Sequence, residues 1–79
     1  MKAKKNKKNI SIELSKEEAI VFLNWLFTFN EKKHTDLFQD QSEERILWDF
    51  EAILEKTLDE TFSNNYKEIL TDARNKIKD

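Results

Sequence analysis

Apolar and polar residues alternate strictly over residues 9–14, where Ile10, Ile12 and Leu14 share one side and polar residues the other. A period of two with β-branched residues predicts a short strand. No second strand pattern follows along the chain. The strand could pair with its own copy in a dimer, add to the sheet of a partner, or lie extended across the helices, and the pattern leaves these alternatives open.

From residue 15 onward the apolar spacing becomes helical. Ser15 with Glu18 three residues later forms a capping box, which predicts a helix over about residues 16–32. All the apolar residues between Ala19 and Phe29 except Val21 lie within an arc of about 220° around this helix, twice the width that a surface helix needs. We therefore expect it to be the central helix, covered from two sides, or to form half of an interface.

Asp40 and Glu43 indicate the start of a second helix, over about residues 41–61. The apolar residues along one face of this helix are expected to face the core. They are Ile46, Leu47, Phe50, Ile53, Leu54 and Leu58.

Trp48 projects nearly opposite that face, on the charged side of the same helix. It either packs under the loop or strand, or anchors a partner, because tryptophan is the commonest residue type among binding hot spots. The partner-binding residues that we expect are Trp48, Glu44, Glu51, Glu55, Trp25 and Phe29.

A third helix is expected over about residues 64–78, capped by Ser63 or an adjacent asparagine. Its apolar stripe consists of Tyr66, Ile69, Leu70, Ala73 and Ile77. In the loop between the first two helices, Leu37 and Phe38 are expected to turn back towards the core, and His34 to be solvated. The predicted fold class is therefore mostly α: a short N-terminal β-strand followed by a three-helix bundle.

The charge is distributed unevenly along the chain. The first eight residues are expected to be a disordered basic arm with five lysines, Lys2, Lys4, Lys5, Lys7 and Lys8. Residues 9–79, expected to be a single small helical domain, hold nine Lys or Arg against sixteen Asp or Glu, a net charge of −7. An acidic surface of this kind predicts a protein partner with a basic surface, although a solvated face is the commoner meaning of such a charge run.

Several kinds of chemistry are excluded by composition. The chain has no cysteine, no glycine and one histidine, so it lacks thiolate metal sites and glycine-rich phosphate loops. We expect no catalytic residues, no metal, no cofactor and no small-molecule substrate, and therefore not an enzyme. The longest mainly apolar segment, eleven residues from Ala19 to Phe29, is interrupted by Asn24 and Thr28. It is shorter than the about twenty residues that span a bilayer. A cytoplasmic protein without a membrane partner is expected.

Two resemblances add to this interpretation. Residues 44–51, with Leu54-Glu55-Lys56, Phe62-Ser63 and Tyr66-Lys67-Glu68, resemble a group of short bacterial proteins of unknown function, over residues 12–78. This likeness implies no activity.

Residues 10–18 are similar to the strand-then-helix start of ribbon-helix-helix repressors, which dimerise through a ribbon that enters the major groove. That resemblance implies a dimer that binds DNA through the strand and the basic arm. Against it, the outward residues would be Ser11 and Glu13, which lack the donors that read bases, and the following loop is much longer than in that fold.

The leading prediction is a small acidic protein-interaction module, such as an antitoxin-, immunity- or inhibitor-like subunit or an accessory subunit of a larger complex. One alternative is the DNA-binding repressor, although we do not expect a nucleic acid as partner. The other is a structural homodimer joined through the strand at Ile10, Ile12 and Leu14.

Overall fold

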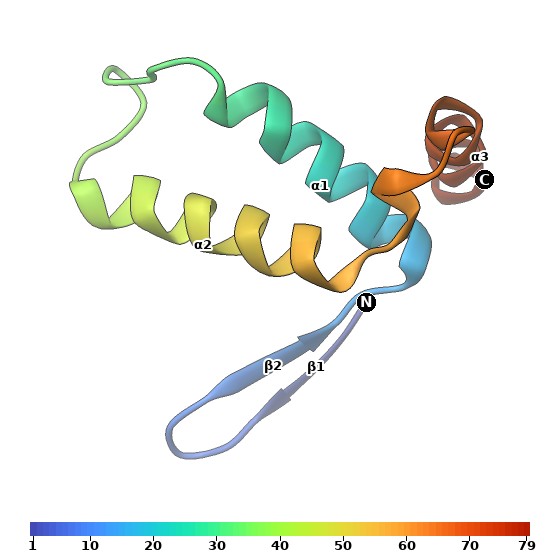
Figure 1. The fold of residues 1–79 in the computed structure, drawn as a ribbon. Coiled ribbons are helices and arrows are strands. Elements are labelled where there is room, and N and C mark those ends of the chain that lie inside the picture. The colour runs from blue at the N-terminus through green and yellow to red at the C-terminus, as the bar shows by residue number, and fades with distance from the viewer.

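The computed structural model describes all residues, 1–79, and is mostly helical. A hairpin of two strands, β1 (Lys2–Lys5) and β2 (Ile10–Glu13), precedes three helices. The helices are α1 (Lys16–Asn30), α2 (Gln41–Thr57) and α3 (Tyr66–Lys78), and a short 3-10 turn, η1 (Glu60–Phe62), lies before α3 (Figure 1). The three predicted helices are confirmed, and each ends or begins within a few residues of its expected bounds.

The hairpin corrects the prediction for the N-terminus. Residues 2–5 form β1, which pairs antiparallel with β2, so the expected disordered arm is in part a strand and β2 is not alone. The hairpin closes through Asn6, whose Oδ1 accepts hydrogen bonds from the backbone N–H groups of Lys8 (2.9 Å) and Asn9 (2.7 Å). This local side-chain turn needs no residue with positive φ, and the alternation of Lys and Ala in β1 gives no apolar pattern that would predict it.

Helix α1 starts where the capping box places it. The Glu18 N–H donates to Ser15 Oγ (3.1 Å), and the Ser15 N–H donates to Glu18 Oε1 (2.8 Å). Four apolar residues of this helix are buried, namely Ala19, Ile20, Leu23 and Leu26. Leu23 and Leu26 have no exposed surface, which places the centre of the core on α1.

The prediction that α1 is central and covered from two sides is confirmed. It packs against both α2 and α3, whereas α2 and α3 scarcely touch each other. In Figure 1, α1 and α2 lie side by side and α3 is seen nearly end-on, crossing α1 steeply. The contacts do not confirm a closed three-helix bundle, because α2 and α3 pack on α1 and not on each other.

Helix α2 begins after Asp40, whose Oδ2 accepts a hydrogen bond from the Ser42 N–H (2.9 Å). Of its expected core face, Leu54 and Leu58 are buried and Leu47 is half-buried. The other half of that prediction is wrong, because three of the six residues are exposed: Ile46, Phe50 and Ile53. The helix has two neighbouring apolar stripes, and α1 covers only one of them.

Helix α3 is held to α1 by its apolar stripe and by an ion pair. Leu70 and Ala73 are buried, whereas Ile77 is exposed. One ion pair joins α3 to α1, with Lys76 Nζ 3.5 Å from Glu17 Oε1. A second joins α1 to η1, with Lys16 Nζ 3.1 Å from Glu60 Oε2. Asn65 is the N-terminal capping residue, without a side-chain hydrogen bond.

Candidate protein-interaction surfaces

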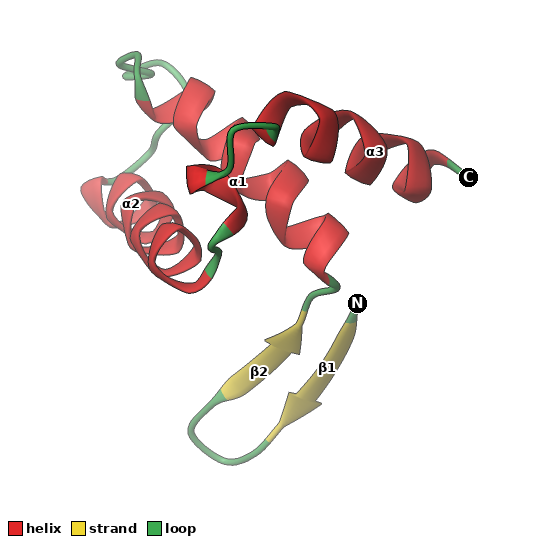
Figure 2. Ribbon diagram, turned by 45° about the vertical axis from the view of Figure 1, so that its right-hand side comes forward, coloured by secondary structure: helices red, strands yellow, loops and turns green.

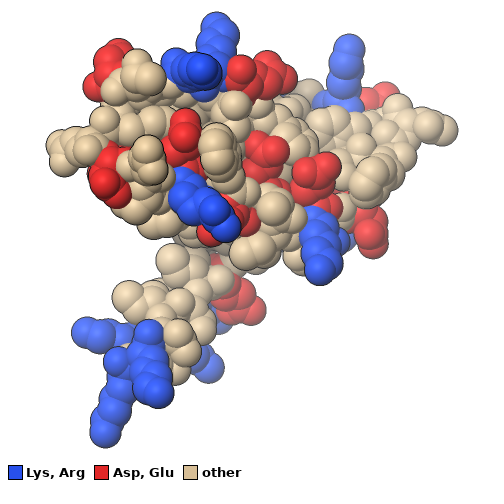
Figure 3. Space-filling model, turned by 60° about the vertical axis from the view of Figure 1, so that its left-hand side comes forward, with Lys and Arg blue, Asp and Glu red and all other residues tan.

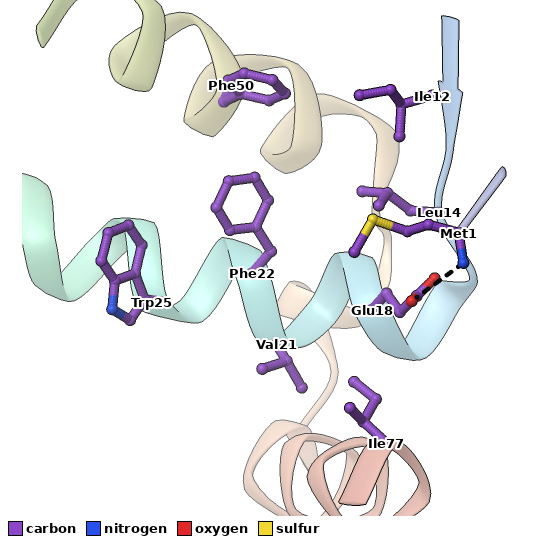
Figure 4. A pocket seen from close by; sticks show the side chains of 9 residues that line it. All are labelled: Met1, Ile12, Leu14, Glu18, Val21, Phe22, Trp25, Phe50 and Ile77. Atoms are coloured by element: carbon purple, nitrogen blue, oxygen red, sulfur yellow. Dashed lines mark hydrogen bonds and ion pairs between the residues drawn. The ribbon is translucent and has the colours of Figure 1, made fainter. Parts of the chain in front are cut away.

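An apolar groove lies between the hairpin, α1, α2 and the end of α3 (Figure 4). Its volume is about 540 Å³, and eight of its nine lining residues are apolar. They are Met1, Ile12, Leu14, Val21, Phe22, Trp25, Phe50 and Ile77, and the ninth is Glu18. The fold thus collects apolar side chains from four elements on one open face.

Each element contributes to the groove for a local reason. The alternation of β2 brings Ile12, and Leu14 after it, to the face that looks towards α2 (Figure 4). Val21 and Phe22 are neighbours on α1 that point to different sides, towards Ile77 and Phe50 respectively. The groove is therefore built across the side of α1 that neither α2 nor α3 covers.

A row of aromatic rings forms one wall of this groove and continues beyond it. Phe22 meets Phe50 edge-to-face with ring centroids 5.6 Å apart, and lies parallel to Trp25 at 6.3 Å. Trp25 stacks on Phe29 at 4.8 Å. Despite these contacts, half of the Trp25 surface (50%) is exposed, so the row offers a broad aromatic surface to an incoming molecule.

The end of this row corrects the prediction for the loop. His34 is half-buried instead of solvated: its ring stacks on Phe29 with centroids 3.9 Å apart. Its Nε2 lies 2.7 Å from the Phe29 carbonyl oxygen and must be the donor, because a carbonyl only accepts. Phe38 packs edge-on against Phe29 at 6.1 Å as expected, whereas Leu37 is exposed.

Glu18 is the single charged side chain in the groove. Its carboxylate accepts hydrogen bonds from the Ser15 N–H and from the N-terminal amino group of Met1, at 2.8 Å and 3.4 Å. The backbone hydrogen bond from Ser15 is the main reason why the pKa of this carboxyl is lowered below its ordinary value. Desolvation opposes this shift, and the nearby amino group of Met1 adds to it. The carboxylate is therefore already satisfied, and the rest of the groove is apolar.

Trp48 lies on the opposite flank of α2 from the groove. Phe50, two residues on, is turned by about 200° around the helix and contacts Phe22. The Trp48 side chain is about half exposed (51%), like that of Trp25. The two tryptophans are thus both accessible, but on different faces of the molecule.

The acidic residues expected around Trp48 lie on the same flank of α2, but they differ in exposure and in hydrogen bonding. Glu55 is exposed and Glu44 is half-buried. Glu51 turns towards α1, where its Oε1 accepts a hydrogen bond from Asn30 Nδ2 (2.9 Å). We call Trp48, Glu44 and Glu55 the Trp48 surface.

The five lysines expected in an arm, Lys2, Lys4, Lys5, Lys7 and Lys8, all lie on the hairpin and are exposed. Figure 3 shows basic side chains gathered at the protruding end of the hairpin, whereas acidic and basic side chains are mixed on the helical body.

The sequence-based site residues are thus split between two faces. Trp25 and Phe29 belong to the aromatic row and Trp48 to the other flank. Phe22 and Phe50, which form much of the groove, were not among the expected site residues, and Phe50 was assigned to the core. The signal that could have found Phe50 is the doubled apolar face of α2, since one neighbouring helix covers only one stripe, and for Phe22 it is the broad apolar arc of α1.

Comparisons with protein-family models, with curated proteins and with solved structures find no match to this chain. No three or more His, Cys, Asp or Glu side chains converge as a metal site would require. None of the helices has both the length and the apolar character needed to cross a bilayer.

Proposed function

We propose that this protein is a small, non-enzymatic interaction module that binds a protein partner with a basic surface. Such a module would act as an antitoxin-, immunity- or inhibitor-like subunit, or as an accessory subunit of a larger complex. The observation that carries the proposal is the half-exposed Trp48 indole on a helix flank with acidic neighbours.

Aromatic and charged residues contribute differently to binding in protein interfaces, and the Trp48 surface contains both. A large aromatic side chain gains most when a partner covers its exposed half. Carboxylates at its edge, Glu44 and Glu55, would attract a basic surface and orient it, which mainly raises the association rate. Glu51, held by Asn30, would keep the flank fixed before binding.

A second candidate, nucleic-acid binding, is favoured by the five exposed lysines on the hairpin. The lysines project away from a body with a net charge of −7, which would repel phosphates. In ribbon-helix-helix repressors the ribbon is formed by strands from two chains, whereas here β2 pairs with β1 of its own chain. We therefore rank this function second.

The test compares three forms of the full chain as baits in cell lysate: wild type, Trp48→Ala and Phe62→Ala. Phe62 is a matched control, because it is an aromatic residue that is 80% exposed and lies outside the Trp48 surface. A captured partner is then purified and titrated. We expect Trp48→Ala to weaken binding by about thirtyfold, or about 2 kcal/mol, with an unchanged melting temperature, and Phe62→Ala to bind as wild type.

Equal binding by Trp48→Ala and wild type would contradict the proposal, as would a collapse of stability in that variant. Adding salt should slow association with the protein partner only moderately. Steeply salt-dependent binding of DNA that is abolished by replacing the hairpin lysines with glutamine would instead support the second candidate.

A further inference from the structure

The chain exposes more surface than a protein of its size should. Its accessible surface is 6935 Å² for a mass of 9.5 kDa, whereas a compact monomer of that mass exposes about 5,000 Å². Its radius of gyration of 14.2 Å likewise exceeds the about 12 Å of a compact domain of this length. The difference between the observed and the expected accessible surface is larger than the area, about 800 Å², that each partner buries in an interface of standard size.

Part of this excess is the hairpin, which projects from the helices (Figure 2). In its register Ala3 pairs with Ile12 and Lys5 with Ile10, so these four side chains share one face. Every residue of both strands is exposed, Ile10 by 68%. Because an isolated two-stranded hairpin is marginally stable in water, this face needs a cover that the helices do not provide.

The cover must be apolar and must tolerate a cluster of lysines. Helix α2 carries such a surface in the exposed stripe Ile46, Phe50 and Ile53, spaced as i, i+4 and i+7. Glu43 and Asp49 lie beside this stripe, one on each edge, and Asp49 also pairs with Arg45 at 3.4 Å. The stripe is therefore complementary to the hairpin in both apolar character and charge.

The hairpin face and the stripe adjoin on one side of the molecule, because Ile12 and Phe50 line the same groove (Figure 4). A two-fold axis through this side would place each hairpin on the stripe of the other copy. Such a contact buries the hairpin face and the stripe of both copies. The assembly is complete with two chains, because neither surface is left free to bind a third.

We infer that two copies of this chain form a symmetric dimer in which the hairpin of each covers the groove and the Ile46, Phe50 and Ile53 stripe of the other. This contact differs from edge-to-edge pairing of β2 with its copy, since it uses side chains of the hairpin face. It is independent of the proposed function, because Trp48 lies on the other flank of α2.

The test measures the oligomeric state by sedimentation equilibrium over a wide range of concentration. Wild type should be a dimer. Ile53→Lys places a charge where the lysines of the other hairpin arrive, and should raise the dimer dissociation constant by about tenfold or more. Ile53 is already 63% exposed within one chain, so the substitution should leave the fold of the monomer intact, which circular dichroism checks.

Ala52→Lys is the matched control, since it adds the same charge at the adjacent exposed position, turned away from the stripe. It should stay dimeric, as should Trp48→Ala. Combining Ile53→Lys with Lys5→Glu should restore dimerisation, because the charges then attract across the interface. A wild type that sediments as a monomer, a chain that forms open-ended polymers, or equal dissociation of the Ala52→Lys and Ile53→Lys variants would overturn the inference.

Discussion

At the scale of single residues, His34 shows how one loop side chain completes a helix. Helix α1 has no basic residue in its last turn, and its final carbonyl groups lack partners within the helix. The His34 ring stacks on Phe29 and its Nε2 donates to the carbonyl of the same residue. One side chain thereby ties the long loop to the end of α1.

We predict that His34→Ala lowers the free energy of unfolding by about 1 kcal/mol, since it removes an aromatic stack and a hydrogen bond. His34→Phe should recover part of the loss, because it keeps the stack and lacks the donor. Urea denaturation followed by circular dichroism measures both. Thr35→Ala, an exposed neighbour, is the control, and a His34→Ala variant as stable as this control would refute the assignment.

At the scale of elements, α1 and α2 begin where side chains accept hydrogen bonds from free backbone N–H groups, whereas α3 begins without such a cap. Ser15 and Glu18 provide these acceptors for α1, and Asp40 does so for α2. Hydrogen bonds to these carboxylates favour their charged form, so the pKa of Glu18 and the pKa of Asp40 are both lowered. The caps therefore link helix stability to pH.

For Glu18, the folded pKa is lower than the ordinary value of 4.5. The unfolded chain then binds more protons near this pH, so the contribution to stability is present above pH 4.5 and is lost as the pH falls through the folded pKa. We predict that Glu18→Gln lowers the melting temperature at neutral pH and reduces its decrease on acidification, because it removes the carboxylate that titrates. Glu55→Gln, at an exposed glutamate outside the caps, should behave as wild type, and an unchanged acid response in Glu18→Gln would contradict the prediction.

At the scale of the whole molecule, few residues are buried relative to the number that form helices and strands. Eight of 79 residues are buried, all apolar, and they cluster around α1. The hairpin and one stripe of α2 contribute nothing to this core. Stability of the fold should therefore depend on what covers these surfaces, which the proposed dimer would do.

We predict that the melting temperature of wild type increases with protein concentration, because a dimer that dissociates on unfolding is stabilised by mass action. Ile53→Lys should melt at a lower temperature with little dependence on concentration, and Trp48→Ala should keep the dependence of wild type. Differential scanning calorimetry over a series of dilutions measures this. A wild-type melting temperature that stays constant on dilution would count against the dimer.

The sequence by itself determined the features that depend on residues close together in the chain. The capping residues Ser15 and Asp40 mark the starts of α1 and α2, because each acts on N–H groups two or three residues away. The broad apolar arc of α1 indicated its central position, since only a helix covered from two sides can bury so wide a face. The sequence left open whether Trp48 is packed or accessible, and the structure shows that it is about half exposed.

Only the tertiary structure decided which apolar surfaces are left open. Two stripes of α2 satisfy the same helical spacing, and the burial of Leu54 and Leu58 together with the bond from Asn30 to Glu51 shows which one turns to α1. Strand β1 has no apolar pattern, so its pairing with β2 emerges from the Asn6 turn. These outcomes depend on contacts between residues distant in sequence or on a single local turn, and neither leaves a periodic pattern in the chain.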